Sequence, residues 1–159
     1  MRTLAIATIL LAAACSTDAR EQSQAPVTSQ AVLTGARPHK MHRCPSAVPA
    51  AITKVTAVDD GVELTITSTD LTSQHDIVAL AGFQSRIGEA WWFLPQHSEL
   101  HGGPGNIGFC PIIHRNTDVS VTPIPDGVRI HVKARAAADV KPLQDATSTR
   151  LRALTMPSI

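Results

Sequence analysis

Residues 44–62 read CPSAVPAAITKVTAVDDGV, and residues 110–128 read CPIIHRNTDVSVTPIPDGV. The second stretch starts 66 positions after the first, and seven of the 19 aligned residues are identical without a gap. The identical residues are Cys-Pro at the start, Val-Thr in the middle and Asp-Gly-Val at the end. Self-similarity at a fixed spacing is typical of a repeated structural unit. The two stretches therefore predict two copies of one unit.

Each copy predicts a β-hairpin. The predicted strands are residues 53–58 and 62–67 in the first copy and residues 119–124 and 128–133 in the second. They are rich in β-branched residues and are joined through Asp59-Asp60-Gly61 and through Asp126-Gly127, which are hairpin signals. Apolar residues alternate with polar ones along the second strand of each hairpin, so one face is expected to be buried. The inward residues would be Val62, Leu64, Ile66, Val128, Ile130 and Val132, with His131 outward.

A helix is predicted after each hairpin. Ser73 is the expected cap of a helix that starts near Gln74 and stops at Gly88. Asp139 is the expected cap of the second helix, and Pro142 is tolerated because it falls within the first turn. The second helix carries an apolar stripe that consists of Val140, Leu143, Thr147, Leu151 and Leu154.

The predicted fold class is α+β, built from two tandem ββα repeats whose equivalent positions are the ones aligned above. Because an isolated hairpin is marginal in water, the copies are expected to pack around a pseudo-twofold axis into one domain. This domain would have one four-stranded antiparallel sheet with two helices on one face. Its predicted parts are repeat 1 at about 44–88, an inter-repeat loop at 89–109 and repeat 2 at about 110–155, within residues 39–159.

Composition argues against one class of partner. The chain has 159 residues, a formal net charge of +1 and 3% aromatic residues, with no Tyr. A nucleic-acid-binding protein needs a basic surface that replaces the released counterions. We therefore expect no nucleic-acid partner. The hydrophobic fraction of 43% is enough for the core of one ordinary domain.

The first fifteen residues read MRTLAIATILLAAAC. Arg2 gives a positive start, the next residues are mostly apolar, and an Ala run precedes Cys15. This apolar run is typical of a signal peptide, because spanning a bilayer takes about 20 residues. The stretch resembles a bacterial lipoprotein signal, although Ala12 stands where Leu is usual. The resemblance implies that residues 1–14 are a signal peptide and that Cys15 is lipidated. The alternative is an ordinary secretory signal that leaves Cys15 as an unpaired thiol.

The resemblance also implies a location. Ser16 is not the Asp that typically retains such proteins at the inner membrane, so the expected place is the periplasmic face of the outer membrane. Acyl chains on Cys15 would join the chain to that membrane. The following residues are rich in Ser, Thr, Gln and Ala and lack a helix or strand period. Residues 15–38 are therefore predicted to be the lipidated cysteine and a flexible tether.

Cys44 and Cys110 occupy equivalent positions of the repeat. In an oxidising compartment an even pair of cysteines most simply forms a disulfide. Residues related by a twofold axis can meet close to that axis, which favours this pairing. The alternative is that both cysteines are thiolate ligands of a metal.

Histidines form the candidate metal site. Two precede Cys44 closely, two are spaced four residues apart, and one follows Cys110 by four residues. Imidazole and sulfur suit copper and zinc, but the spacing matches no closed zinc template. The candidate ligands are His39, His42, His97, His101 and His114.

Trp91, Trp92 and Phe93 make the inter-repeat loop distinctive. One interpretation is a crossover whose aromatic side chains fill the sheet edge or the core. The other is a binding loop with these three residues as an interaction surface, because binding sites gather on loops of rigid scaffolds.

These features predict a lipid-anchored, non-enzymatic binding or interaction module of the cell envelope. No nucleophile elbow, P-loop or marked carboxylate pair indicates a catalytic site. The expected partners are the membrane and an unknown envelope protein or small ligand, and no cofactor is expected. One alternative is a periplasmic copper- or zinc-binding protein that uses the clustered histidines. A second alternative is an unrecognised envelope hydrolase.

Overall fold

The computed structural model describes residues 28–32, 41, 43–90 and 110–155. In this part of the chain, no helix is long and apolar enough to cross a membrane. The elements in chain order are β1 (Thr28–Val32), η2 (Pro45–Ala47), β2 (Ile52–Val58), β3 (Gly61–Thr67), α1 (Leu71–Ala90), β4 (Thr117–Ile124), β5 (Gly127–Ala134), η4 (Ala137–Asp139) and α2 (Val140–Thr155).

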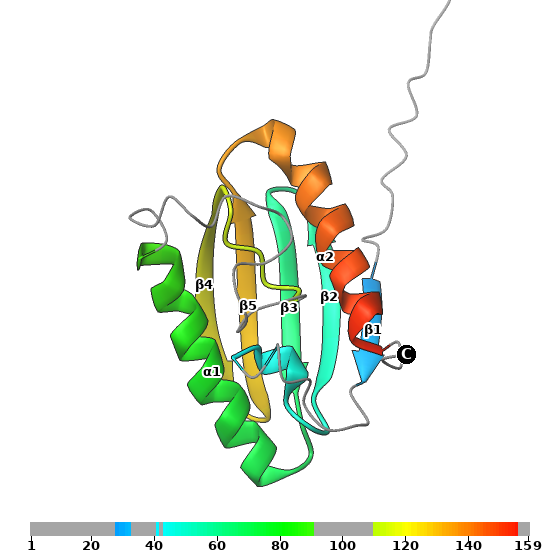
Figure 1. Ribbon diagram of the computed structural model, residues 1–159, viewed down its shortest axis with the longest axis vertical. Helices are drawn as coiled ribbons and strands as arrows, with labels where there is room; N and C mark the ends of the chain where they lie inside the picture. Colours follow the sequence, from blue (N-terminus) through cyan, green and yellow to red (C-terminus); the bar gives the residue numbers. More distant parts are fainter. Residues whose placement is uncertain (1–27, 33–40, 42, 91–109, 156–159) are drawn as a thin grey trace, which may run out of the picture.

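The strands form one five-stranded antiparallel sheet in the order β1-β2-β3-β5-β4. Both helices lie in front of this sheet in Figure 1, with α1 against β4 and β5 and α2 against β1 and β3. The α+β class and the helix pair are therefore as predicted from the sequence.

The predicted number of four strands is wrong, because β1 adds a fifth strand at the edge of β2. This strand lies inside the segment that was predicted to be a flexible tether. Ala31 faces Thr53 across the ladder and packs against the core, whereas Gln30 is exposed. Strand pairing depends on backbone hydrogen bonds. A short polar segment can therefore add to an open sheet edge without a marked pattern of its own.

The core lies between the sheet and the helices. All six predicted inward residues of β3 and β5 are at most 1% exposed, and His131 points to the other face. The predicted stripe of α2 is also confirmed, because Leu143, Thr147, Leu151 and Leu154 are buried and Val140 packs against the core.

Two connecting segments fill the space between the helices (Figure 1). The first contains η2, in which Ala47 is fully buried, and the second follows Cys110 and buries Ile112 completely. The Cys44–Cys110 disulfide joins them. These segments therefore belong to the core and position the site that is described below.

The β3–β5 ladder pairs residues in a regular register. Leu64 lies opposite Ile130 in this ladder, and their separation along the chain is 66, the same as that of the two bonded cysteines. Gly61 and Gly127 have the same separation and lie at opposite ends of the ladder. This constant separation therefore relates one half of the ladder to the other.

Two hydrogen bonds, one at each end of this ladder, also join residues with matching positions in the sequence. The Ser68 N–H donates to the Asp126 carbonyl at 3.1 Å, and the Ala134 N–H donates to the Asp60 carbonyl at 2.8 Å. The two donors occupy equivalent positions of the repeat, and so do the two acceptors.

The glycine of each Asp-Gly pair is required by the close packing of the strands. Gly61 and Gly127 are the first residues of β3 and β5 and do not lie inside the turns. A Cβ on Gly61 would lie 2.1 Å from the carbonyl oxygen of Val132, and a Cβ on Gly127 would lie 2.1 Å from that of Ile66. Only glycine therefore allows the two central strands to approach this closely.

The start of α1 differs from the prediction. The helix begins at Leu71, and Asp70 is the cap, because its Oδ2 accepts the Ser73 N–H at 2.8 Å. Hydrogen bonds from Ser73 lower the pKa of the Asp70 carboxyl group. The predicted cap Ser73 lies inside the first turn, and its hydroxyl donates to the Pro49 carbonyl at 2.9 Å. The helix also continues past Gly88 to Ala90.

Candidate functional site

Most of the predicted site residues lie outside the described part of the chain. They are Cys15, His39, His42, Trp91, Trp92, Phe93, His97 and His101. The lipidation site, four of the five candidate metal ligands and the aromatic interaction surface therefore stay predictions.

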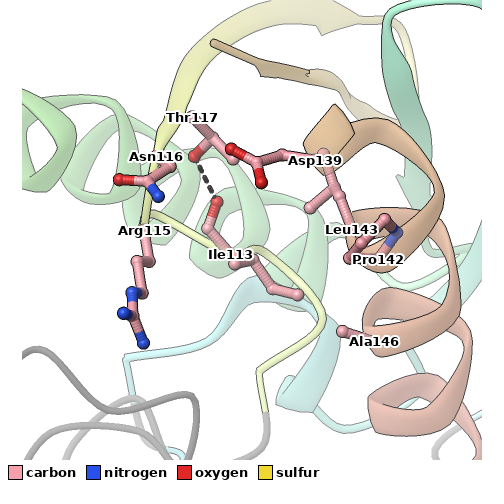
Figure 2. A pocket seen from close by; sticks show the side chains of 8 residues that line it. All are labelled: Ile113, Arg115, Asn116, Thr117, Asp139, Pro142, Leu143 and Ala146. Atoms are coloured by element: carbon pink, nitrogen blue, oxygen red, sulfur yellow. Dashed lines mark hydrogen bonds between the residues drawn. The ribbon is translucent and has the colours of Figure 1, made fainter. Parts of the chain in front are cut away.

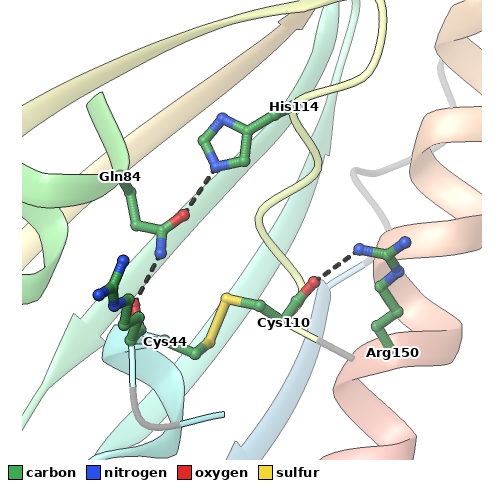
Figure 3. Close-up of a disulfide and its surroundings, with 6 residues drawn as sticks. Cys44, Gln84, Cys110, His114 and Arg150 are labelled. Carbon is green, nitrogen blue, oxygen red and sulfur yellow. Dashed lines mark hydrogen bonds between the residues drawn. A yellow bond between two sulfur atoms is a disulfide. The ribbon is translucent and has the colours of Figure 1, made fainter. Parts of the chain in front are cut away.

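The predicted disulfide is confirmed. Cys44 and Cys110 are bonded, their Cα atoms are 5.6 Å apart, and both are fully buried. The bond uses both sulfur atoms, so the alternative of two thiolate ligands does not hold. Figure 3 shows the disulfide between the segment that contains η2 and the segment that leads to β4.

His114 contacts α1. Its Nε2 lies 2.7 Å from Oε1 of Gln84, and Nε2 of Gln84 donates to the Arg43 carbonyl at 2.7 Å (Figure 3). Because the amide oxygen of Gln84 is an acceptor, Nε2 of His114 carries the ring proton. Burial, and then the charge of Arg150, lower the pKa of His114 to about 4. The imidazole is therefore neutral at pH 7 and links α1 to the segment after Cys110.

Arg150 on α2 makes the corresponding contact on the other side. Its Nη1 donates to the carbonyl of Cys110 at 3.0 Å (Figure 3). Arg150 and Gln84 are equivalent positions of the repeat, so each helix donates from a matching position to a backbone carbonyl at or beside a cysteine. Among the described residues, no group of three His, Cys, Asp or Glu side chains is placed to hold a metal ion.

A pocket of about 230 Å³ opens between residues 113–117 and the start of α2 (Figure 2). Its apolar lining comes from Ile113, Pro142, Leu143 and Ala146. Its polar lining comes from Arg115, Asn116, Thr117 and Asp139. A dry cavity of about 150 Å³ binds benzene in another protein, so this volume suits a group of at least that size.

Three of the polar lining groups are available to a ligand. The Thr117 hydroxyl already donates to the Ile113 carbonyl at 2.6 Å. In contrast, the side chains of Arg115, Asn116 and Asp139 form no hydrogen bond or ion pair with another described residue. Small-molecule sites typically combine an apolar pocket with a few polar groups of this kind.

Asp139 was predicted to cap α2, and this prediction is wrong. A cap at this position would accept from the backbone N–H two or three residues further on. The residue three positions further on is Pro142, which has no N–H. No capping hydrogen bond of Asp139 is present among the described residues, and its carboxylate lines the pocket instead (Figure 2).

The equivalent positions of the first repeat show how the two halves differ. Ser73 stands in the place of Asp139, and Pro49 in the place of Arg115. These two are joined by the hydrogen bond from the Ser73 hydroxyl to the Pro49 carbonyl. Leu80 stands in the place of Ala146, and both residues pack against the core. At the positions that line the pocket in the second half, the first half therefore has a hydrogen-bonded pair and a larger apolar residue.

One backbone feature recurs in the two halves. Ala50 has a φ of 61° and Asn116 a φ of 55°, a left-handed conformation that is uncommon for residues other than glycine. The two residues are equivalent positions of the repeat. The side chains around this shared feature differ between the two copies, and this difference is the signal in the sequence that points to the pocket.

No protein-family model, curated protein or solved structure matches this chain. The function is therefore inferred from the residues of the chain itself.

Proposed function

We propose that the chain is an exported, lipid-anchored binding module of the bacterial cell envelope, joined through Cys15 to the periplasmic face of the outer membrane. The observation that carries this proposal is the fully buried Cys44–Cys110 disulfide. Structural disulfides persist in oxidising compartments such as the periplasm and are rare in the cytosol. The signal-like residues 1–14 and the cysteine that follows them agree with export to that compartment.

The proposed role is binding rather than catalysis. The pocket beside α2 supports this role, because it combines an apolar surface with polar groups that make no hydrogen bond or ion pair in the described part of the chain.

We also propose that the domain is a duplicated ββα unit with a pseudo-twofold axis through the middle of the β3–β5 ladder. The pairing of Leu64 with Ile130 supports this, because residues at equivalent positions meet only near such an axis. The disulfide joins Cys44 and Cys110, which are also equivalent positions. In this view, β1 is an addition to the first unit.

Metabolic labelling tests the anchor. The full chain is produced in a double-membraned bacterial host with radiolabelled palmitate, and the two membranes are then separated. We expect label on the wild-type protein in the outer-membrane fraction and none on Cys15→Ser. A variant with both Cys44→Ala and Cys110→Ala should still be labelled, because it keeps Cys15.

Two results would contradict the proposal. An unlabelled wild-type protein that is released with the periplasmic contents would indicate an ordinary secretory signal. A protein recovered from the periplasm with free thiols at Cys44 and Cys110 would remove the main support for the proposed export to an oxidising compartment. Intact mass distinguishes the two redox forms, because the bonded form is lighter by two hydrogen atoms.

A further inference from the structure

We infer that the pocket between residues 113–117 and the start of α2 binds a small zwitterion, namely a free α-amino acid with a branched or aromatic side chain. This inference rests on the proposed binding function and names its site and its ligand class.

The apolar half of the pocket sets the size of the side chain. Ile113 and Leu143 are buried and line the pocket together with Ala146, which is smaller than Leu80 at the matching position of the first half. The volume of about 230 Å³ exceeds what a benzene-sized group needs. An alkyl or aromatic side chain of an amino acid therefore fits, whereas that of alanine would leave most of the space empty.

The polar half of the pocket offers two opposite charges to a ligand. Asp139 and Arg115 both line the pocket, and neither pairs with the other or with another described side chain. Asp139 is partly buried, so its carboxylate is the stronger candidate partner for an ammonium group. Arg115 is exposed, and its guanidinium suits a carboxylate. A zwitterion can contact both groups, whereas a ligand with one charge can contact only one of them.

The second half of the chain also differs from the first in a way that a purely structural role does not explain. At the matching positions Ser73 and Pro49 are uncharged and bond to each other, which fastens the start of α1. Asp139 and Arg115 do not fasten the start of α2 and expose an apolar surface between them.

Calorimetric titration of the full chain in lipid nanodiscs tests the inference, with empty nanodiscs as the blank. The probes are L-leucine and L-phenylalanine. Three comparison compounds each lack one feature: L-alanine lacks the large side chain, L-leucinamide the carboxylate, and 4-methylpentanoic acid the ammonium group. We expect saturable binding of L-leucine or L-phenylalanine and weaker binding of all three comparison compounds.

Variants locate the site. Asp139→Asn keeps the shape and removes the charge, so binding should weaken by about tenfold, the order of one hydrogen bond to a charged group. Ala146→Leu copies Leu80 and should abolish binding by filling the pocket. Asp59→Asn is the matched control, because Asp59 is exposed in the β2–β3 turn, and its affinity should equal that of the wild type.

Circular dichroism verifies that each variant is folded, and Asp139→Asn keeps the test valid if Ala146→Leu is unfolded. The inference is overturned if neither amino acid binds, if the comparison compounds bind equally well, or if Asp139→Asn binds as tightly as the wild type. These failures would leave the palmitate labelling and the disulfide unchanged. They are therefore distinguishable from a failure of the proposed envelope location.

Discussion

Leu64 on β3 lies directly opposite Ile130 on β5, and both side chains are fully buried. Their separation along the chain is 66, which is also the separation of the two cysteines in the disulfide. At the centre of the sheet and in the disulfide, the two paired residues are therefore separated by the same number of positions along the chain. Changes at matching positions of the two halves can be compared directly, and the predictions below use such pairs.

Loss of the disulfide should destabilise the domain by about 4 kcal/mol, because the bond closes a long loop and limits the unfolded chain. Replacing both Cys44 and Cys110 by Ala removes the bond, and urea unfolding measures the change. The wild-type protein unfolded in the presence of a reductant is the control and should lose a similar amount. An unchanged free energy of unfolding in both samples would mean that the bond does not constrain the unfolded state.

The two strand glycines should be intolerant of a methyl group. In Gly61→Ala and Gly127→Ala the new Cβ would lie 2.1 Å from a backbone carbonyl oxygen of the facing strand. Each substitution should lower the free energy of unfolding by about 3 kcal/mol, the upper end of the overpacking range. Gly82→Ala is the matched control, because a Cβ there has no atom within 4 Å. It should stabilise α1 by about 0.5–1 kcal/mol. Equal effects at the three positions would contradict this account.

Stability should decrease as the pH is lowered, because of His114. Its pKa is lowered from 6.5 to about 4 in the folded protein, so the unfolded chain takes up the proton first. The contribution is fully present above pH 6.5 and is lost as the pH falls toward 4. The loss would reach about 3 kcal/mol. It is measured by urea unfolding at several pH values between these limits.

Two variants isolate this effect. His114→Gln keeps a polar side chain near Gln84 and cannot titrate, so its stability should change less over this pH range. His75→Gln removes an exposed histidine of α1, and its free energy of unfolding should change with pH as much as that of the wild type. If the free energy of unfolding of His114→Gln also changed as much as that of the wild type, another group would cause the pH dependence.

The two acidic residues near the helix starts should differ in their effect on stability. Asp70→Ala removes the carboxylate that accepts the Ser73 N–H, which should cost about 1 kcal/mol. Asp139→Ala removes a carboxylate that makes no hydrogen bond with a described residue, so it should change stability by less than about 0.5 kcal/mol. Thermal unfolding of the two variants gives the comparison. A larger loss in Asp139→Ala would mean that Asp139 fastens the start of α2.

Much of the fold was predictable because it depends on local patterns. Alternation along residues 62–67 and 128–133 identified the buried face, since successive strand residues point to opposite sides. The equivalent cysteines indicated the disulfide. Strand β1 was not predictable in this way, because a short edge strand needs only backbone pairing with β2. The cap of α1 was misplaced by three residues, because Ser73 and Asp70 are both good caps and only the backbone shows where the helix begins.

The site was less predictable than the fold. The histidine pattern indicated His114, and the structure adds what the pattern does not show, namely its burial and its contact with Gln84. The pocket was missed, because its lining comes from the segment before β4 and from the start of α2, which are far apart in the sequence. Asp139 was assigned to a cap because the missing N–H of Pro142 was not taken into account.

The sequence by itself determined the hairpins, the two helices, the buried face and the cysteine pair, because each depends on residue type and spacing along the chain. Only the tertiary structure decided the order of the strands, the added edge strand and the pocket beside α2. Those features depend on which segments meet in space. The pocket is an example, because Ile113 comes from the segment before β4 whereas Leu143 and Ala146 come from α2.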